Sequence, residues 1–231
     1  MSNVITIYHG SQSIIEKPFF GGGKKHNDFG LGFYCTENEE LAKEWAVSPS
    51  FDGYCNRYQI DTEYLNILYL NTPKYTILNW IAILVEHRLF EIKSPNARRA
   101  KQYLNEHFGI NVNAFDIIVG YRADDSYFEF AEAFLNNAIT VNQLGRAMKL
   151  GKLGEQIVIK SEYSFSLLEY QGYSIANKEE FFSKRKARDE AARQSYLEIL
   201  SDEDTDGLYI QDIIRGGIGN EDPRIPRNIP S

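Results

Sequence analysis

Runs of β-branched and aromatic residues recur along the chain and predict a series of short strands. The first, from Val4 to Tyr8, is predicted to be a buried strand that ends at residues 9–11. Further strands are predicted at 30–36, 54–60, 65–70, 114–120, 156–161 and 166–170.

Helical spacing of apolar residues predicts helices between these strands. Glu39 follows Thr36 by three residues, a capping-box pattern that predicts a helix start at Thr36. The apolar face of this helix would comprise Leu41, Ala42, Trp45 and Ala46.

Three more helical regions follow. The helical period runs from 77 to 108 and is interrupted near Ser94–Pro95, which predicts two helices there. Another helix is predicted at 127–138, and a long charged one without a strong apolar stripe at 179–200. Residues 216–231 contain three Pro and three Gly, have little to pack with, and are expected to be mobile.

Composition is that of an ordinary soluble globular protein, with 43% hydrophobic and 25% charged residues. The 25 basic and 32 acidic residues give a net charge of −7, so no global field attracts nucleic acid, although a local basic groove would escape that count.

Cys35 and Cys55 are too few for a disulfide framework or a zinc cluster, so we expect two reduced thiols and no metal. The chain starts directly with a predicted strand, and its longest wholly apolar stretch, 80–85, is far shorter than the ~20 residues that span a bilayer. We therefore expect a cytoplasmic protein with no membrane association.

His9 is the first candidate for chemistry. It comes directly after the first strand, where a side chain can leave the sheet edge and face a cleft. Gly10 would let a ligand approach the backbone, whose N–H and C=O complement a primary carboxamide. The alternative is a purely structural turn.

A second candidate segment runs from Phe29 to Trp45. Gly30 and Gly32 would project to one face of a strand and leave a flat floor. Tyr34 would wall that floor and stack on a planar heterocycle, with Trp45 as the opposing wall. The alternative is a strand with a bulge and two core aromatics.

These two segments, Tyr8–Ser11 and Phe29–Tyr34, resemble the paired signature of the poly(ADP-ribose) polymerases and the diphtheria-toxin-like ADP-ribosyltransferases. A further bacterial group of the same superfamily is more similar still. It shares Tyr-His-Gly-Ser, the Asp-Phe-Gly-x-Gly-Phe-Tyr-x-Thr of 28–36, an Ala-Trp-Ala-like helix end that is Glu-Trp-Ala here at 44–46, and the Gly-x-x-Ala-Asp-Asp of 120–125. The resemblance extends from residue 8 to about residue 170.

The third residue of the superfamily's His-Tyr-Glu/Gln set comes from a later strand. Registered on the polymerases it would be Glu155; registered on the bacterial group it would be Gln156. Only one of two adjacent strand residues can face the site, and we favour Gln156 because the bacterial group matches over a longer stretch. An amide holds ribose hydroxyls but offers only a dipole to the developing positive charge, so Gln argues for single transfer rather than chain elongation.

The resemblance also implies roles on the NAD⁺ side. His9 would bond the adenosine-side ribose, and the Gly10 backbone would hold the nicotinamide carboxamide. Tyr34 and Trp45 would sandwich the nicotinamide ring, and the remaining NAD⁺-binding positions of the motifs are Ser11 and Gly32.

Two other groups of residues carry open alternatives. Asp124 and Asp125 would position the acceptor or act as its base, or else cap the next helix and fix a turn. The basic loop at 24–26 would meet the NAD⁺ pyrophosphate, or else is simply solvated.

The implied fold is α+β, an ADP-ribosyltransferase-like split β-sandwich of two strongly bent antiparallel sheets with helices around them. Residues 1–178 would form the catalytic domain, and 179–231 a charged helix with a flexible tail. The implied activity is NAD-dependent mono-ADP-ribosyl transfer to a macromolecule, in a bacterial toxin or anti-phage effector. The alternatives are an NAD glycohydrolase and an inactive module that binds NAD or ADP-ribose. The acceptor class stays open, as does an antitoxin or inhibitor protein as partner.

Overall fold

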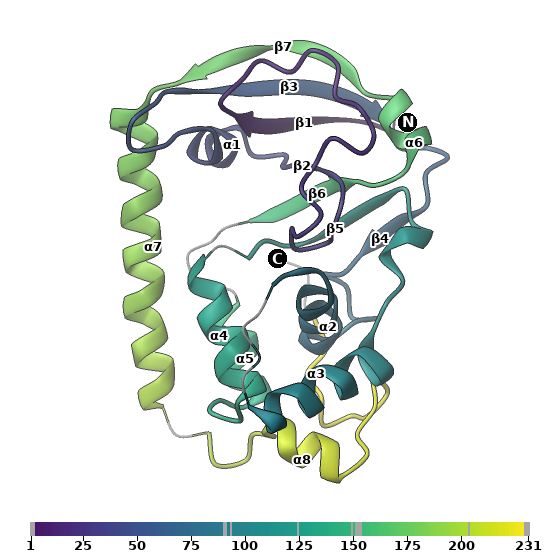
Figure 1. The fold of residues 1–231 in the computed structure, drawn as a ribbon, viewed down its shortest axis with the longest axis vertical. Helices are drawn as coiled ribbons and strands as arrows, with labels where there is room; N and C mark the ends of the chain where they lie inside the picture. The colour runs from purple at the N-terminus through teal and green to yellow at the C-terminus, as the bar shows by residue number, and fades with distance from the viewer. Residues whose placement is uncertain are drawn as a thin grey trace.

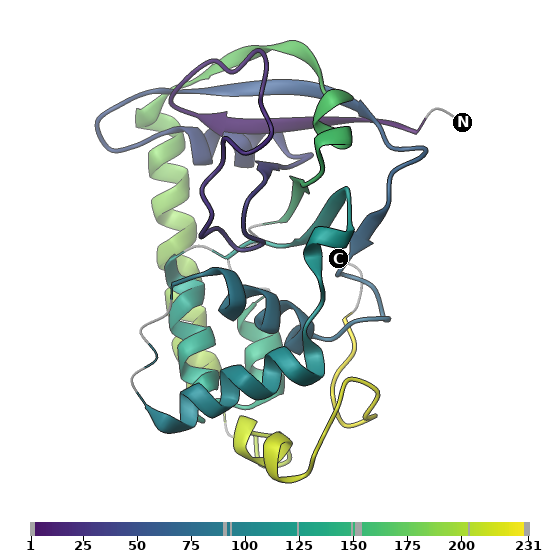
Figure 2. The same ribbon diagram turned by 45° about the vertical axis from the view of Figure 1, so that its right-hand side comes forward.

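The computed structural model describes residues 3–89, 92, 94–123, 125–148, 150, 154–202 and 204–228, and no side chains for 125–127. Two sheets lie one above the other, and most of the helices pack below the second sheet (Figure 1). The long helix α7 (Lys178–Ser201) runs down one side from the first sheet to the helices. Figure 2 shows the same layers from another direction.

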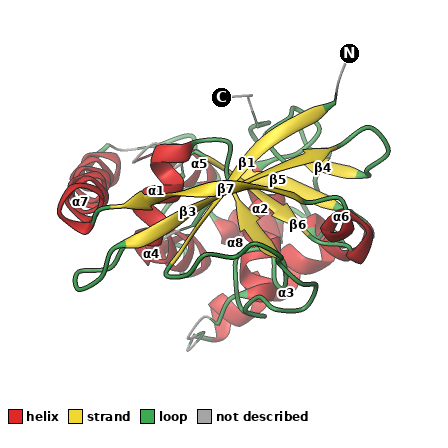
Figure 3. Cartoon of the chain, turned by 90° about the horizontal axis from the view of Figure 1, so that it is seen from above, coloured by secondary structure: helices red, strands yellow, loops and turns green. Residues whose placement is uncertain are grey.

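The first sheet has three antiparallel strands in the order β1-β3-β7. They are β1 (Val4–Ser11), β3 (Gly53–Asp61) and β7 (Glu169–Ala176). The second sheet has four strands in the order β2-β6-β5-β4, namely β2 (Phe33–Cys35), β4 (Ile67–Tyr69), β5 (Ile117–Tyr121) and β6 (Glu155–Ile159). Seen from above, the strands of the two sheets cross (Figure 3). The fold is therefore mixed α+β with two sheets, as expected, but β4 pairs with β5 in parallel, so the second sheet is not wholly antiparallel.

The described helices connect the strands, and most of them lie below the second sheet (Figure 1). They are α1 (Glu39–Ala46), α2 (Ile77–His87), α3 (Pro95–Phe108), the 3₁₀ turn η1 (Val112–Ala114), α4 (Asp125–Leu135), α5 (Val141–Ala147), α6 (Glu162–Ser166), α7 and α8 (Ile210–Arg215). Helix α2 is apolar on all sides, and residues 77–85 are all buried, which makes it the centre of the helical layer. None of the helices in the described ranges is long and apolar enough to cross a bilayer.

A second core fills the space between the sheets. Ile7 and Tyr58 of the first sheet pack against Phe33 and Ile159 of the second. The two sheets also meet at their edges, because Tyr8 and Thr36 exchange backbone hydrogen bonds of 2.8 and 3.0 Å. This bridge brings β1 beside β2, which matters for the site described below.

Most of the predicted elements are confirmed, including the break at Ser94, whose side chain caps α3. The predicted cap at Thr36 is wrong. Thr36 is held in extended backbone by its bridge to Tyr8, and Asn38 caps α1 by accepting from the Leu41 N–H. The segment predicted to continue the sheet at 166–170 is interrupted by α6, and β7 belongs to the other sheet.

The C-terminal part of the chain packs more than its sequence suggested. Helix α7 buries an intermittent set of residues, namely Phe181, Ala192, Tyr196 and Ile199. It also reaches α1 through an ion pair with the buried Glu44, to which the partly exposed Arg188 donates hydrogen bonds of 2.8 and 3.1 Å. The expectation that the tail has little to pack with is wrong up to residue 228. Ile218 and Ile225 are buried, and Asn228 donates to the Leu70 carbonyl at 2.7 Å.

Candidate functional site

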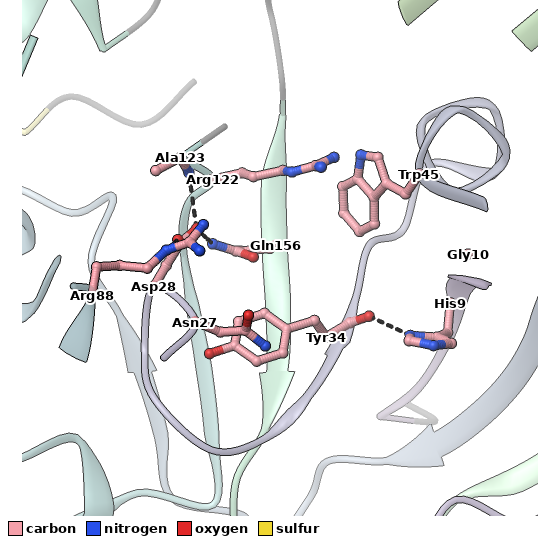
Figure 4. A pocket seen from close by; sticks show the side chains of 10 residues that line it. All are labelled: His9, Gly10, Asn27, Asp28, Tyr34, Trp45, Arg88, Arg122, Ala123 and Gln156. Atoms are coloured by element: carbon pink, nitrogen blue, oxygen red, sulfur yellow. Dashed lines mark hydrogen bonds and ion pairs between the residues drawn. The ribbon is translucent and has the colours of Figure 1, made fainter. Parts of the chain in front are cut away.

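A cavity of about 180 Å³ lies where β1, β2, α1 and β6 come together. Figure 4 shows the residues that line it, which are His9, Gly10, Asn27, Asp28, Tyr34, Trp45, Arg88, Arg122, Ala123 and Gln156. His9, Tyr34 and Gln156 come from three different strands. The fold thus brings together residues that are far apart in the sequence.

His9 is held by the neighbouring strand. Its Nδ1 lies 2.7 Å from the Tyr34 carbonyl, and because a carbonyl can only accept, Nδ1 is the donor. Burial lowers the pKa of His9, and the bond to Tyr34 only partly offsets this. The neutral ring therefore carries its proton on Nδ1 and presents a lone pair on Nε2. The ring also stacks on Phe33, with centroids 4.2 Å apart.

Gly10 is required by packing rather than by access for a ligand. A Cβ at Gly10 would lie 1.9 Å from the Ala42 carbonyl oxygen, so the glycine leaves room for α1. Its backbone groups still face the open edge of β1. Tyr8 uses that side of the strand to bond Thr36, and backbone groups two residues apart point the same way. The Gly10 N–H and C=O are thus directed away from β3.

The Tyr34 ring forms a fixed wall of the cavity. Its hydroxyl donates to the Gly30 carbonyl at 2.6 Å and accepts from the Phe29 N–H at 3.1 Å. Burial raises the pKa of Tyr34, and the charge of Asp28 raises it further, so the phenol stays neutral.

Trp45 projects into the cavity from α1, and one face of its indole is covered by Arg122, whose guanidinium carbon lies 4.2 Å from the ring centroid. A planar ligand would have to stack on the other face or displace this guanidinium. Trp45 thus lies at the cavity, with an arginine already beside it.

Gln156 is fixed by two acceptors. Its Nε2 donates to Asp28 Oδ2 at 2.7 Å and to the Tyr121 carbonyl at 3.0 Å. The amide nitrogen therefore points away from the cavity, and Oε1 points toward it (Figure 4). At this position the site offers a hydrogen-bond acceptor.

Asp28 is the buried centre of a network that connects three segments of the chain. Arg88 Nε donates to Oδ1 at 2.8 Å, and the Ala123 N–H donates to Oδ2 at 2.9 Å, beside the bond from Gln156. Arg88 also bonds the His26 carbonyl at 3.3 Å and lies 4.6 Å from the Phe128 ring centroid. Sequence reasoning included Asp28 in a motif but gave it no role, and it missed Arg88, Arg122 and Asn27, which have no local pattern around them.

Lys160 is a further buried group that the sequence did not reveal. Its Nζ donates to the carbonyls of Phe29 and Leu31 at 2.8 and 2.7 Å, which ties down the segment that follows Asp28. Burial lowers the pKa of Lys160 to about 8.

Other predicted residues lie outside the cavity lining. Glu155 accepts from the Asn71 side chain, on the opposite face of β6 from Gln156. The exposed Ser11 hydroxyl donates to the Ser13 carbonyl. Gly32 lies in a bend before β2, where a Cβ would be 2.6 Å from Val158 Cγ1.

The flat floor predicted from Gly30 and Gly32 is wrong. Gly30 has φ +72°, a left-handed conformation, so the chain turns there and the strand begins only at Phe33. The two glycines serve a tight turn and close packing instead.

The acceptor-side residues remain predictions. Asp124 lies outside the described residues, and Asp125 begins α4 without a described side chain. Lys24 and Lys25 are exposed, and neither is among the lining residues. Cys35 and Cys55 are both buried free thiols, as expected.

The fold and cavity define an α+β domain in which two sheet edges enclose a small polar site. The chain belongs to the family described as "Protein of unknown function (DUF3990)", which matches residues 5–170 and so includes every residue of the cavity lining. No curated protein and no solved structure gave a significant match.

Proposed function

We propose that the chain is an NAD⁺-dependent mono-ADP-ribosyltransferase and that the cavity binds the nicotinamide end of NAD⁺. The observation that carries this proposal is the convergence of His9, Tyr34 and Gln156 on one cavity. These are the residues for which the sequence resembles the His-Tyr-Glu/Gln transferases. Gln156, rather than Glu155, is the member of its pair that lines the cavity.

The polarity of the cavity supports a sugar as ligand. His9 Nε2 and Gln156 Oε1 are both acceptors, because each residue uses its N–H groups on protein carbonyls or a carboxylate. Acceptors of this kind complement hydroxyl groups, which a ribose supplies. The backbone N–H and C=O of Gly10 offer the donor and the acceptor that a carboxamide needs. The Tyr34 ring offers a flat wall.

The size of the cavity supports the binding of part of NAD⁺. Its volume of about 180 Å³ is below the roughly 300–1,000 Å³ of a pocket that encloses a drug-sized ligand. The nicotinamide and its ribose would occupy it, and the remainder of NAD⁺ would extend over the surface.

The reaction breaks the bond between the nicotinamide nitrogen and ribose C1′. The electron pair leaves with nicotinamide, positive charge develops on the ribose, and a nucleophile of the acceptor attacks C1′ and loses a proton. Gln156 Oε1 would hold a ribose hydroxyl, and the Tyr34 ring would stack on the nicotinamide ring. Because the amide carries no formal charge, this arrangement suits single transfer.

Two alternatives remain beside this proposal. With water as the acceptor the chain would be an NAD glycohydrolase. The neutral Gln156, with Asp28 already bonded to three donors, favours the second alternative, a module that binds NAD or ADP-ribose without reacting. Two parts of the proposal rest on the sequence resemblance alone. They are the macromolecular acceptor and the role as a bacterial toxin or anti-phage effector.

The test is transfer of label from adenine-labelled NAD⁺ in cell lysate, followed by protease or nuclease digestion to identify the acceptor. His9→Ala should abolish the label, and His107→Ala is the matched control, because His107 is an exposed histidine on α3. Release of nicotinamide without labelled product would indicate the glycohydrolase. Binding of NAD⁺ with neither transfer nor release would indicate the binding module.

A further inference from the structure

The side-chain amide of Gln156 lies between two groups that can only accept hydrogen bonds. Asp28 Oδ2 and the Tyr121 carbonyl are 2.7 and 3.0 Å from Nε2. An NH₂ group has two protons and satisfies both acceptors, whereas an oxygen atom in its place would satisfy neither. The orientation of the carboxamide thus follows from its surroundings.

Asp28 keeps its position without help from Gln156. Arg88 holds its Oδ1, and the backbone N–H of Ala123 holds Oδ2. The side chain of Asp28 is buried, with only 4% of its surface exposed. It is therefore a rigid acceptor against which the longer side chain of Gln156 is oriented.

A glutamate at position 156 would meet unfavourable contacts in the same place. One carboxylate oxygen would face Asp28 and the Tyr121 carbonyl at the distances that Nε2 now has, and two like charges would be adjacent. Only the protonated acid could donate to Asp28 and still present a carbonyl oxygen to the cavity.

We infer that Asp28 is a positioning residue that locks the carboxamide of Gln156, and that glutamine rather than glutamate is the functional residue at this position. The orientation follows from the contacts above, and its functional consequence rests on the proposed transferase activity. Asp28 directs Oε1 into the cavity as a permanent acceptor for a substrate hydroxyl. The site therefore requires the amide of glutamine at position 156.

Other charged or titratable groups around the cavity bear on this argument. Arg88 binds the far oxygen of Asp28, and Arg122 lies over Trp45. His9 and Tyr34 line the same cavity, where burial lowers the pKa of His9 and raises the pKa of Tyr34, and both shifts favour the neutral forms. His9 affects parent and variant alike, so the ratio of their activities isolates residue 156.

The experiment measures NAD⁺ turnover by the full chain and by Gln156→Glu from pH 5 to pH 9. We expect the ratio of variant to parent activity to fall by about tenfold or more as pH rises, because a hydrogen bond to a charged group is lost when the introduced carboxyl group ionises. A ratio that rises with pH would show that a carboxylate is the better group and would overturn the inference.

Asp28→Asn tests the positioning role directly. Its single acceptor oxygen cannot serve three donors, so we expect turnover to fall by about tenfold or more, as for loss of a charge-assisted hydrogen bond. Full activity of Asp28→Asn would contradict the inference.

Glu44→Gln is the matched control, since it alters another buried carboxylate paired with an arginine, outside the cavity lining. It should lower stability without changing the pH dependence of turnover.

A second measurement is independent of turnover. It is the hydrogen exchange of the Gln156 side-chain NH₂ measured by NMR, where the signal is assigned by its disappearance in Gln156→Glu. Slow exchange that becomes fast in Asp28→Asn would support the lock, and equal exchange would overturn it. Absence of transfer and NAD⁺ binding in the parent would instead overturn the proposed function.

Discussion

The two walls of the cavity are held in place by different means. The strand wall, which consists of His9, Gly10 and Tyr34, is fixed by backbone pairing and by packing against α1. The carboxylate network, which consists of Asp28, Arg88, Ala123 and Gln156, is fixed by hydrogen bonds to one buried carboxylate. The strand wall should therefore tolerate the replacement of a polar side chain but not an added side-chain atom at a close contact. The carboxylate network should tolerate small changes in side-chain volume but not the loss of a hydrogen-bond partner of Asp28.

The largest effect expected is that of added volume on the strand wall. Gly10→Ala would place a methyl group 1.9 Å from the Ala42 carbonyl oxygen and should lower the free energy of unfolding by about 3 kcal/mol or prevent folding. Chemical denaturation measures this. Gly145→Ala is the control: its Cβ would meet no atom within 4 Å, so this helical position should become slightly more stable. Equal effects of the two substitutions would contradict the packing role of Gly10.

The carboxylate network should respond to the loss of a charged partner. Arg88→Met leaves the buried Asp28 without its guanidinium and should lower the free energy of unfolding by about 2 kcal/mol, since Arg88 is itself partly exposed. The control is Arg224→Met, which removes a local ion pair with Asp222 in which the guanidinium is more than half exposed, and it should lower the free energy of unfolding much less than Arg88→Met does. Similar melting curves for both variants would show that Asp28 does not need Arg88.

A smaller effect is expected where a side chain supports the strand wall. Tyr34→Phe keeps the ring but leaves the Phe29 N–H and the Gly30 carbonyl without their partner, at a cost of about 1–2 kcal/mol. The free energy of NAD⁺ binding, measured by calorimetry, should change less than the free energy of unfolding does. Tyr64→Phe alters an exposed ring and serves as the control. A complete loss of binding with unchanged stability would mean that the hydroxyl acts on the ligand.

The smallest effect concerns Lys160, which lies behind both walls. Its folded pKa of about 8 is below the ordinary 10.5, so the unfolded chain binds more protons between these values. The contribution of Lys160 to stability is present above pH 10.5 and is lost as pH falls toward 8. We expect a difference of about 1 kcal/mol over this range, after allowance for partial solvent screening. Because buried tyrosines and cysteines titrate in the opposite sense, the measurement is the parent curve minus that of Lys160→Met, and a flat difference would contradict the assignment.

The difference between the walls also explains what the sequence could predict. Strands were recognisable from β-branched and aromatic runs, and His9, Tyr34 and Gln156 from short motifs within them. Arg88 is 60 residues from Asp28, and no local pattern indicates that they meet. The pairing of β6 places Gln156, the residue favoured from the sequence, on the cavity and Glu155 on the opposite face of the strand.

Local signals also failed where tertiary contacts overrode them. The helix cap was predicted at Thr36 but lies at Asn38, because the backbone of Thr36 is hydrogen-bonded to Tyr8. The tail was expected to be mobile because its apolar residues are isolated among Pro and Gly. Ile218 and Ile225 are nevertheless buried, since single apolar residues can fill gaps left by distant helices.

The ion pair between the buried Glu44 and Arg188 has a consequence for how this chain can be shortened. Glu44 directly precedes Trp45 on α1, and its guanidinium partner is supplied by α7, more than a hundred residues later. A deletion that removed α7, even one placed beyond the last residue of the family match, would remove the counter-charge of Glu44 next to a wall of the cavity. The C-terminal quarter of the chain is thus tied to the N-terminal site by an ion pair, and shortened forms that lack α7 should be less stable than the full chain.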